Sequence, residues 1–301
     1  MAQSEDPSTR TWGVGVELAE DHLGSVRFAA TLTQNRPSDR VIGLHVLPDQ
    51  ELINPLITHE EADVMRKRVA TDVTEILARE GLAEDTARTE LLEDDEVERG
   101  LSEGAIKLAL DGLIVGRRAK RDEDPIVRLG QVTRRILRRL PVPIMVVPPD
   151  YGSSGDLGLG KGPVILGTDL SDNCAAAARF AQDLATRLDR KLVLAHGTQA
   201  FHWGVSYIPA ATMERLQEQA LAGATAKMQS WASAQGITDA EHQVFVGDPV
   251  KHLLRLAYSE HAAVLVTGSR MLGPIERVFL ASISSEVAAA APCPVAVVPG
   301  K

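Results

Sequence analysis

The sequence has little cysteine and no long apolar run. Only two of its 301 residues are cysteine. Two are too few for a disulfide framework, and this number suits a reducing compartment. We therefore expect Cys174 and Cys293 to be buried thiols, with a redox pair as the alternative. The start of the chain is polar, without an apolar stretch of signal-peptide length, and no later run approaches the roughly 18 apolar residues that span a bilayer. These absences predict a cytoplasmic protein with no membrane segment.

Local signatures of catalysis are also missing. The sequence contains no Gly-x-Ser-x-Gly elbow, Cys-x2-Cys pair or His-Glu-x2-His helix, so triad, zinc-ribbon and zincin chemistry have no support. The second half carries His196, His202, His242 and His252, but their separations are not those of metal ligands. We predict no catalytic or metal-binding residues, and the sequence favours a protein that is not an enzyme.

The charge is acidic overall but uneven. A net charge of −9 argues against broad electrostatic binding to nucleic acid. The stretch from Arg117 to Arg139 is rich in arginine but has no aromatic residue on which bases could stack. It is either an anion site or, as we favour, a solvated helix face that offsets the acidic run from Glu93 to Glu96.

The two halves of the chain repeat each other. Arg27-Phe28-Ala29 recurs as Arg179-Phe180-Ala181, 152 residues later, and Gly116 recurs as Gly268 at the same spacing. The segment that begins at Pro141 recurs 151 residues later. Such a long period indicates a duplicated domain with its own core in each copy. We predict domains at 1–150 and 163–301, joined by a Gly- and Ser-rich linker at 151–162.

Short apolar runs alternate with helical patterns in each copy. In the second copy we expect strands near 163–168, 191–196, 241–246, 263–267 and 295–298, with helices at 171–188, 212–234, 249–259 and 275–291. The first copy follows the same order, with its third strand near 86–92. This alternation predicts two doubly wound, Rossmann-like α/β domains, each with five mainly parallel strands.

In such a sheet, ligands bind at the carboxyl ends of the strands, where the winding reverses. In the second copy Asp169 and Gly268 stand at those ends, and Asp169 or Ser171 is also placed to cap the following helix. The residues after Gly268 form a turn that can direct backbone N–H groups and a cation toward phosphate. The predicted nucleotide-binding residues are Asp169, Gly268, Ser269, Arg270, Gly273 and Ser282.

Several segments of the second copy resemble the universal stress protein family in its tandem form. They are Val164 to Ser171, Leu194 to His196, Gly247-Asp248-Pro249, Thr267 to Arg270, and Pro292 to Val295. The resemblance covers nearly all of 163–301 and extends more faintly over 11–149. It implies a pseudo-dimer in which the two copies pair through their last strands, and it leaves open whether two chains then associate as a homodimer.

Members of this family that bind ATP share the loop Gly-x2-Gly-x9-Gly-Ser/Thr. Laid on the second copy, this loop begins at Gly268 and ends at the hydroxyl of Ser282, but Met271 and Ala281 stand at the other two glycine positions. The first copy departs further. Its loop has Ala119 at the second glycine position and Gln131 in place of the hydroxyl, and its strand-end acid is Glu17. The resemblance therefore implies ATP or AMP in the second copy.

The resemblance implies a tandem universal stress protein, non-enzymatic, which acts in the stress response through protein interaction or nucleotide sensing. One alternative is an ATP/AMP-binding switch with slow ATP hydrolysis in the second domain. Another is a metal- or small-molecule-binding protein built on a degenerate site. The sequence names no protein partner and no stress signal.

Overall fold

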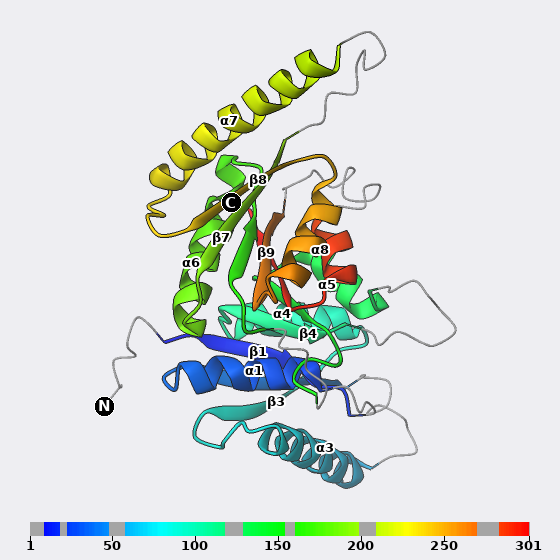
Figure 1. Cartoon of the computed structure of the whole chain (residues 1–301). Helices are drawn as coiled ribbons and strands as arrows, with labels where there is room; N and C mark the ends of the chain where they lie inside the picture. The colour runs from blue at the N-terminus through cyan, green and yellow to red at the C-terminus, as the bar shows by residue number, and fades with distance from the viewer. Residues whose placement is uncertain are drawn as a thin grey trace. The chain divides into compact units, whose positions relative to one another are not determined.

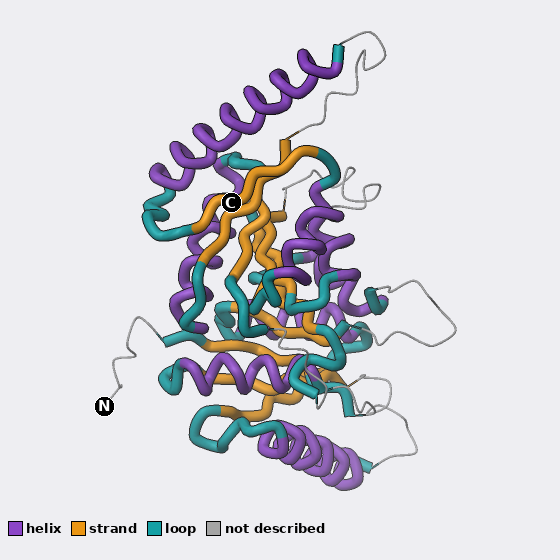
Figure 2. The backbone as a smooth tube through the Cα atoms, in the orientation of Figure 1, coloured by secondary structure: helices purple, strands orange, loops and turns teal. Residues whose placement is uncertain are grey.

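The protein is described by a computed structural model that covers residues 9–18, 23–47, 58–117, 129–153, 160–198, 209–269 and 283–300. The chain divides into two compact units, Met1–Leu157 and Gly158–Lys301. Each unit contains a parallel sheet with helices between its strands (Figures 1 and 2). The predicted duplication and α/β fold class are therefore confirmed.

The first unit has its strands in the order β3-β2-β1-β4-β5, and the pairs within this order are parallel. The third strand, predicted near 86–92, is present as β3. The elements are β1 (Thr11–Gly15), α1 (Gly24–Asn35), β2 (Arg40–Leu47), α3 (His59–Arg79), β3 (Ala87–Glu93), α4 (Val97–Lys107), β4 (Gly112–Gly116), α5 (Gln131–Arg139) and β5 (Ile144–Val147).

The second unit repeats this topology in the order β8-β7-β6-β9-β10, again with parallel pairs. Helix α9 covers the last part of the helix predicted at 275–291, whose earlier residues lie outside the described ranges. The elements are β6 (Val164–Gly167), η1 (Asp172–Cys174), α6 (Ala175–Leu188), β7 (Leu192–Thr198), α7 (Ala210–Ala234), β8 (Glu241–Val246), α8 (Pro249–Ser259), β9 (Val264–Ser269), α9 (Ile283–Ala290) and β10 (Val295–Pro299).

Helices cover both faces of the second sheet. A Cβ atom added to Gly268 would lie 3.4 Å from Cys174 Sγ, just before α6, whereas one added to Gly167 would lie 3.0 Å from Leu253 in α8. Gly167 pairs with Thr267, the residue before Gly268 on β9, so the two glycines face opposite sides of the sheet. These contacts therefore place α6 and α8 on opposite sides. Burial on both faces explains why β6 is a continuous apolar run with no polar alternation.

Cys174 and Cys293 are both buried free thiols, as predicted. No helix within the described ranges is long and apolar enough to cross a membrane.

Candidate functional site

Asp169 organises the turn that follows β6. Its Oδ1 accepts hydrogen bonds from the Ser171 backbone N–H at 3.0 Å, the Ser171 hydroxyl at 2.6 Å and the Cys174 thiol at 3.1 Å. Neither Ser171 nor Cys174 makes a side-chain cap for the helix that follows. The prediction that Asp169 or Ser171 caps the helix is therefore wrong, because the carboxylate closes the turn before the helix begins.

Leu170, the residue after Asp169, has an unusual backbone conformation. Its φ of 61° lies in the left-handed region, which costs a residue with a side chain about 1 kcal/mol. Its N–H donates to the Thr168 hydroxyl at 3.0 Å, and this bond helps to hold the turn. Backbone strain of this kind is concentrated at ligand sites, so the β6 turn is a candidate for function.

Gly268 and Ser269 end β9, the strand next to β6. The Ser284 hydroxyl donates to the Gly268 carbonyl oxygen at 3.1 Å. The first domain repeats this contact, since the Thr133 hydroxyl donates to the Gly116 carbonyl oxygen at 3.1 Å. The structure thus brings Asp169, Gly268 and Ser269 to neighbouring strand ends, while the predicted Arg270, Gly273 and Ser282 lie outside the described residues.

Ser284 was missed by the sequence analysis, which assigned the loop hydroxyl to Ser282. The repeat spacing could have identified Ser284, because Thr133 and Ser284 are 151 residues apart. The last segments of the two copies are related by the same spacing. Both side chains are buried, at 5% and 8% exposure. Their shared role is to hold the carbonyl of the strand-end glycine.

Cys174 lies between the two strand ends. Its thiol contacts Asp169 and also borders Gly268. Burial raises the pKa of the Cys174 thiol, which disfavours the nucleophilic thiolate. The hydrogen bond to Asp169 therefore has the thiol as its donor, and Cys174 serves as a packing and turn residue.

We expect Cys174 to react slowly with a maleimide in the folded protein and faster once Asp169 is replaced by Ala. Removing the carboxylate opens the turn and removes a negative charge that disfavours the thiolate. Mass spectrometry of modification in a Cys293→Ser background would follow Cys174 alone, with an increase of about fivefold or more expected. Equal rates in the two proteins would mean that Asp169 does not shield the thiol.

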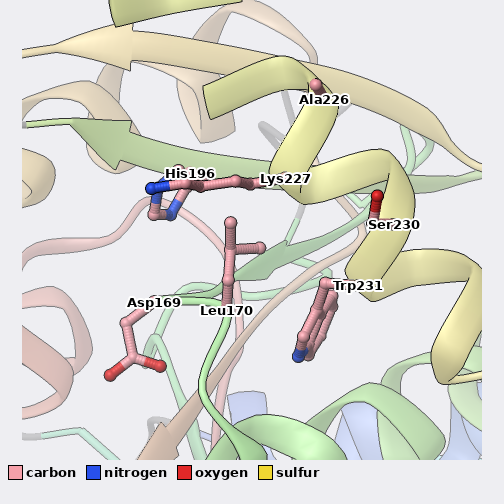
Figure 3. A pocket seen from close by; sticks show the side chains of 7 residues that line it. All are labelled: Asp169, Leu170, His196, Ala226, Lys227, Ser230 and Trp231. Carbon is pink, nitrogen blue, oxygen red and sulfur yellow. The ribbon is translucent and has the colours of Figure 1, made fainter. Parts of the chain in front are cut away.

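A pocket of about 580 Å³ adjoins Asp169, between the ends of β6 and β7 and the helix α7 (Figure 3). Its volume suits a small organic ligand. Asp169 and His196 were singled out from the sequence, but the wall supplied by α7 was not, because a helical apolar pattern gives no sign of which turn will border a cavity. The lining residues are Asp169, Leu170, His196, Ala226, Lys227, Ser230 and Trp231.

Two of these histidines have local partners in the described structure. His196 Nδ1 lies 2.9 Å from the Thr168 carbonyl oxygen, and the His252 ring stacks on Phe245 with ring centres 4.4 Å apart. His202 lies outside the described ranges. Within those ranges, no three His, Cys, Asp or Glu side chains are grouped as metal ligands would be.

Arg139 of the basic stretch pairs with the acidic run, as the favoured interpretation predicted, and Arg135 pairs with a glutamate just beyond that run. Arg135 on α5 contacts the buried Glu98 carboxylate on α4, and Arg139 lies 3.7 Å from Glu96. Burial alone would raise the pKa of Glu98, but the hydrogen bond from Arg135, a backbone hydrogen bond and the charges of Arg135 and Arg139 together outweigh it, and the pKa falls below its ordinary value. These arginines therefore join two helices of the first domain. Residues 118–128 of the stretch lie outside the described ranges.

The topology and the strand-end turn define a Rossmann-like α/β class of protein, in which the sheet's carboxyl edge is the ligand-binding edge. Comparison with known families identifies the family within this class. The profile of the universal stress protein family matches residues 10–148 and again 162–299. The chain belongs to the universal stress protein family and carries two tandem copies of its domain, which confirms the resemblance seen in the motifs.

Individual relatives agree with this assignment. A universal stress protein of Thermus aquaticus is 30% identical over 138 residues, which are 45% of this chain and 96% of that protein. A universal stress protein of Archaeoglobus fulgidus has a similar structure, with a TM-score of 0.64 and 17% identity over 96% of this chain and 98% of that one. A protein of unknown function from Pseudomonas aeruginosa has a TM-score of 0.67 and 15% identity, over 97% and 92% of the two chains. At these identities the two structures show a shared fold.

Proposed function

We propose that this stress protein senses a nucleotide, ATP or AMP, with its second domain and acts on other proteins without catalysing a reaction. The observation that carries the proposal is the position of Asp169. It lies in the turn after β6, beside β9, whose end carries Gly268, and it also borders the pocket under α7. A ligand at Asp169 can therefore extend in both directions, with phosphate toward Gly268 and Ser269 and the sugar and base toward the pocket.

The two domains differ at this edge, and the difference favours the second. Glu17 replaces the strand-end aspartate in the first domain, and Gln131 follows Gly130 where the family loop has a hydroxyl. In the second domain, Met271 and Ala281 replace loop glycines, so we propose that affinity rests mainly on Asp169, Gly268 and Ser269, with Arg270, Gly273 and Ser282 completing the site.

The test is calorimetric titration of ATP and AMP into the full chain, preceded by native mass spectrometry of protein purified without added nucleotide. Asp169→Asn keeps a side-chain carbonyl oxygen that can accept the turn hydrogen bonds but removes the charge, so we expect the affinity to fall about tenfold with little change in thermal stability. Asp172→Ala, at an exposed acid in the same turn, is the control and should bind normally. No binding of either nucleotide at millimolar concentration would refute the sensor and favour a scaffold that acts by protein interaction alone.

We also propose that the two domains pair through their last strands. Within its own domain, β5 or β10 stands last in the strand order, and each is short and follows a Pro-x-Pro segment. An apolar edge strand needs a partner or a cover. Such pairing would make one chain the equivalent of a dimer of single-domain family members.

A further inference from the structure

The α7 wall of the pocket carries a lysine whose charge is not neutralised by its own helix. Lys227 is exposed and lines the pocket together with Asp169, and in Figure 3 its side chain leaves α7 on the side of the pocket where His196 is drawn. A helical ion pair forms between residues three or four positions apart, and at those positions α7 has Gly223, Ala224, Ser230 and Trp231. None of these neighbours is acidic, and within the described ranges no carboxylate pairs with Lys227. Its charge is therefore available to a molecule in the pocket.

The first domain has the opposite charge at the corresponding position. Gly81 and Gly236 follow α3 and α7, both with left-handed φ, 90° and 70°, and they are 155 residues apart. At that spacing Lys227 corresponds to Asp72, which pairs with Arg68 one turn earlier on α3 at 3.2 Å. The position is therefore anionic and paired in the first domain but cationic and unpaired in the second, which agrees with placing an anionic ligand in the second domain.

We infer that Lys227 binds a second phosphate, carried on the ribose of the nucleotide, so that the second domain prefers a nucleoside bisphosphate to a nucleoside monophosphate. This inference rests on the proposed function, in which the 5′ phosphate lies toward Gly268 and the sugar enters the pocket under α7. A lysine ammonium is a compact charge on a flexible four-carbon chain, and it binds phosphate as a point charge without requiring one fixed geometry. Lys227 is thus a specificity-determining residue for the part of the ligand that lies beyond Asp169.

The acid in the pocket makes the expected effect of Lys227 a change of sign. Asp169 lines the same pocket, and its carboxylate repels an added phosphate. Without the charge of Lys227 a ribose phosphate would meet this repulsion alone, so it should weaken binding, whereas with Lys227 present it should strengthen binding. Both effects act between charges that water and salt can reach, so the preference should shrink as the ionic strength rises.

The experiment compares AMP with adenosine 3′,5′-bisphosphate by calorimetry in the full chain at low ionic strength. We expect wild type to bind the bisphosphate about five- to tenfold more tightly than AMP. Lys227→Met keeps an unbranched side chain of similar length without the charge, so it should bind the bisphosphate no more tightly than AMP, with AMP affinity within about twofold of wild type. Lys227→Arg should keep the preference. Lys227→Asp introduces the charge found in the first domain and should bind the bisphosphate about tenfold more weakly than AMP.

The control is Lys251→Met, at an exposed lysine on α8 that does not line the pocket. It changes the net charge equally and should leave both affinities as in wild type. Thermal melting checks that each variant is folded. If AMP binds but wild type binds the bisphosphate no better, or Lys227→Met keeps the preference, the inference is overturned while the nucleotide sensor stands. If neither nucleotide binds to wild type, the proposed function fails and takes this inference with it.

Discussion

Asp39→Ala is expected to lower the free energy of unfolding of the first domain by about 3 kcal/mol, because it leaves a buried indole N–H and a half-buried backbone N–H without their acceptor. Asp39 is fully buried, and its Oδ2 accepts from Trp12 Nε1 at 2.9 Å. Its Oδ1 accepts from the Arg10 backbone N–H at 3.1 Å. These bonds fix the start of β1, a central strand. Trp12 itself is 1% exposed, so water cannot replace the lost acceptor.

Differential scanning calorimetry would show this loss as a fall of about 8 °C in the melting temperature of a domain of this size. Asp85→Ala, at an exposed turn position, is the matched control and should lie within about 0.5 kcal/mol of wild type. The double variant Trp12→Phe with Asp39→Ala removes donor and acceptor together. Its loss of unfolding free energy should be smaller, by at least about 1 kcal/mol, than the sum of the losses in the two single variants. Additive losses would show that the Trp12–Asp39 bond contributes little.

The repeat explains why so much of the fold could be predicted from sequence. Each strand of a doubly wound domain is buried on both faces and reads as a short apolar run, and two copies of the same order reinforce each other. The third strand of the first domain was the harder case, because β3 is charged and only half-buried. It stands at the end of the strand order, where one side of the strand has no neighbour and the apolar signal is weak.

The site was less predictable than the fold, and the reason is physical. Strand ends follow from topology, so Asp169 and Gly268 could be chosen from the sequence. Trp231, more than 60 residues after β6, reaches the same region from α7, and its position there depends on how far α7 is rotated over the sheet. Ser284 lies in a short helix whose register only the repeat spacing reveals. Helix rotation and loop path depend on packing, which no local motif encodes.

Gly268→Ala is expected to reduce ATP or AMP affinity at least tenfold while leaving the fold intact. The added methyl would lie 3.4 Å from Cys174 Sγ and 3.6 Å from Ala177 Cβ, which are ordinary contact distances. The backbone of Gly268 is not among the positive-φ glycines, so alanine adds no conformational strain there. Stability should therefore change by less than about 1 kcal/mol. The binding loss has a separate cause, since the methyl stands beside the thiol that donates to Asp169.

That position is where a ligand extending from Asp169 to the end of β9 must pass close to the backbone, and glycine is the residue that permits such an approach. Gly223→Ala is the matched control, because a methyl there meets nothing within 4 Å on α7 and should stabilise the helix by about 0.5–1 kcal/mol without affecting binding. Calorimetric titration and melting of both variants separate the two effects. If Gly268→Ala binds nucleotide as wild type does, the phosphate does not lie on the Gly268 turn, and the ligand must be held by Asp169 and the α7 pocket alone.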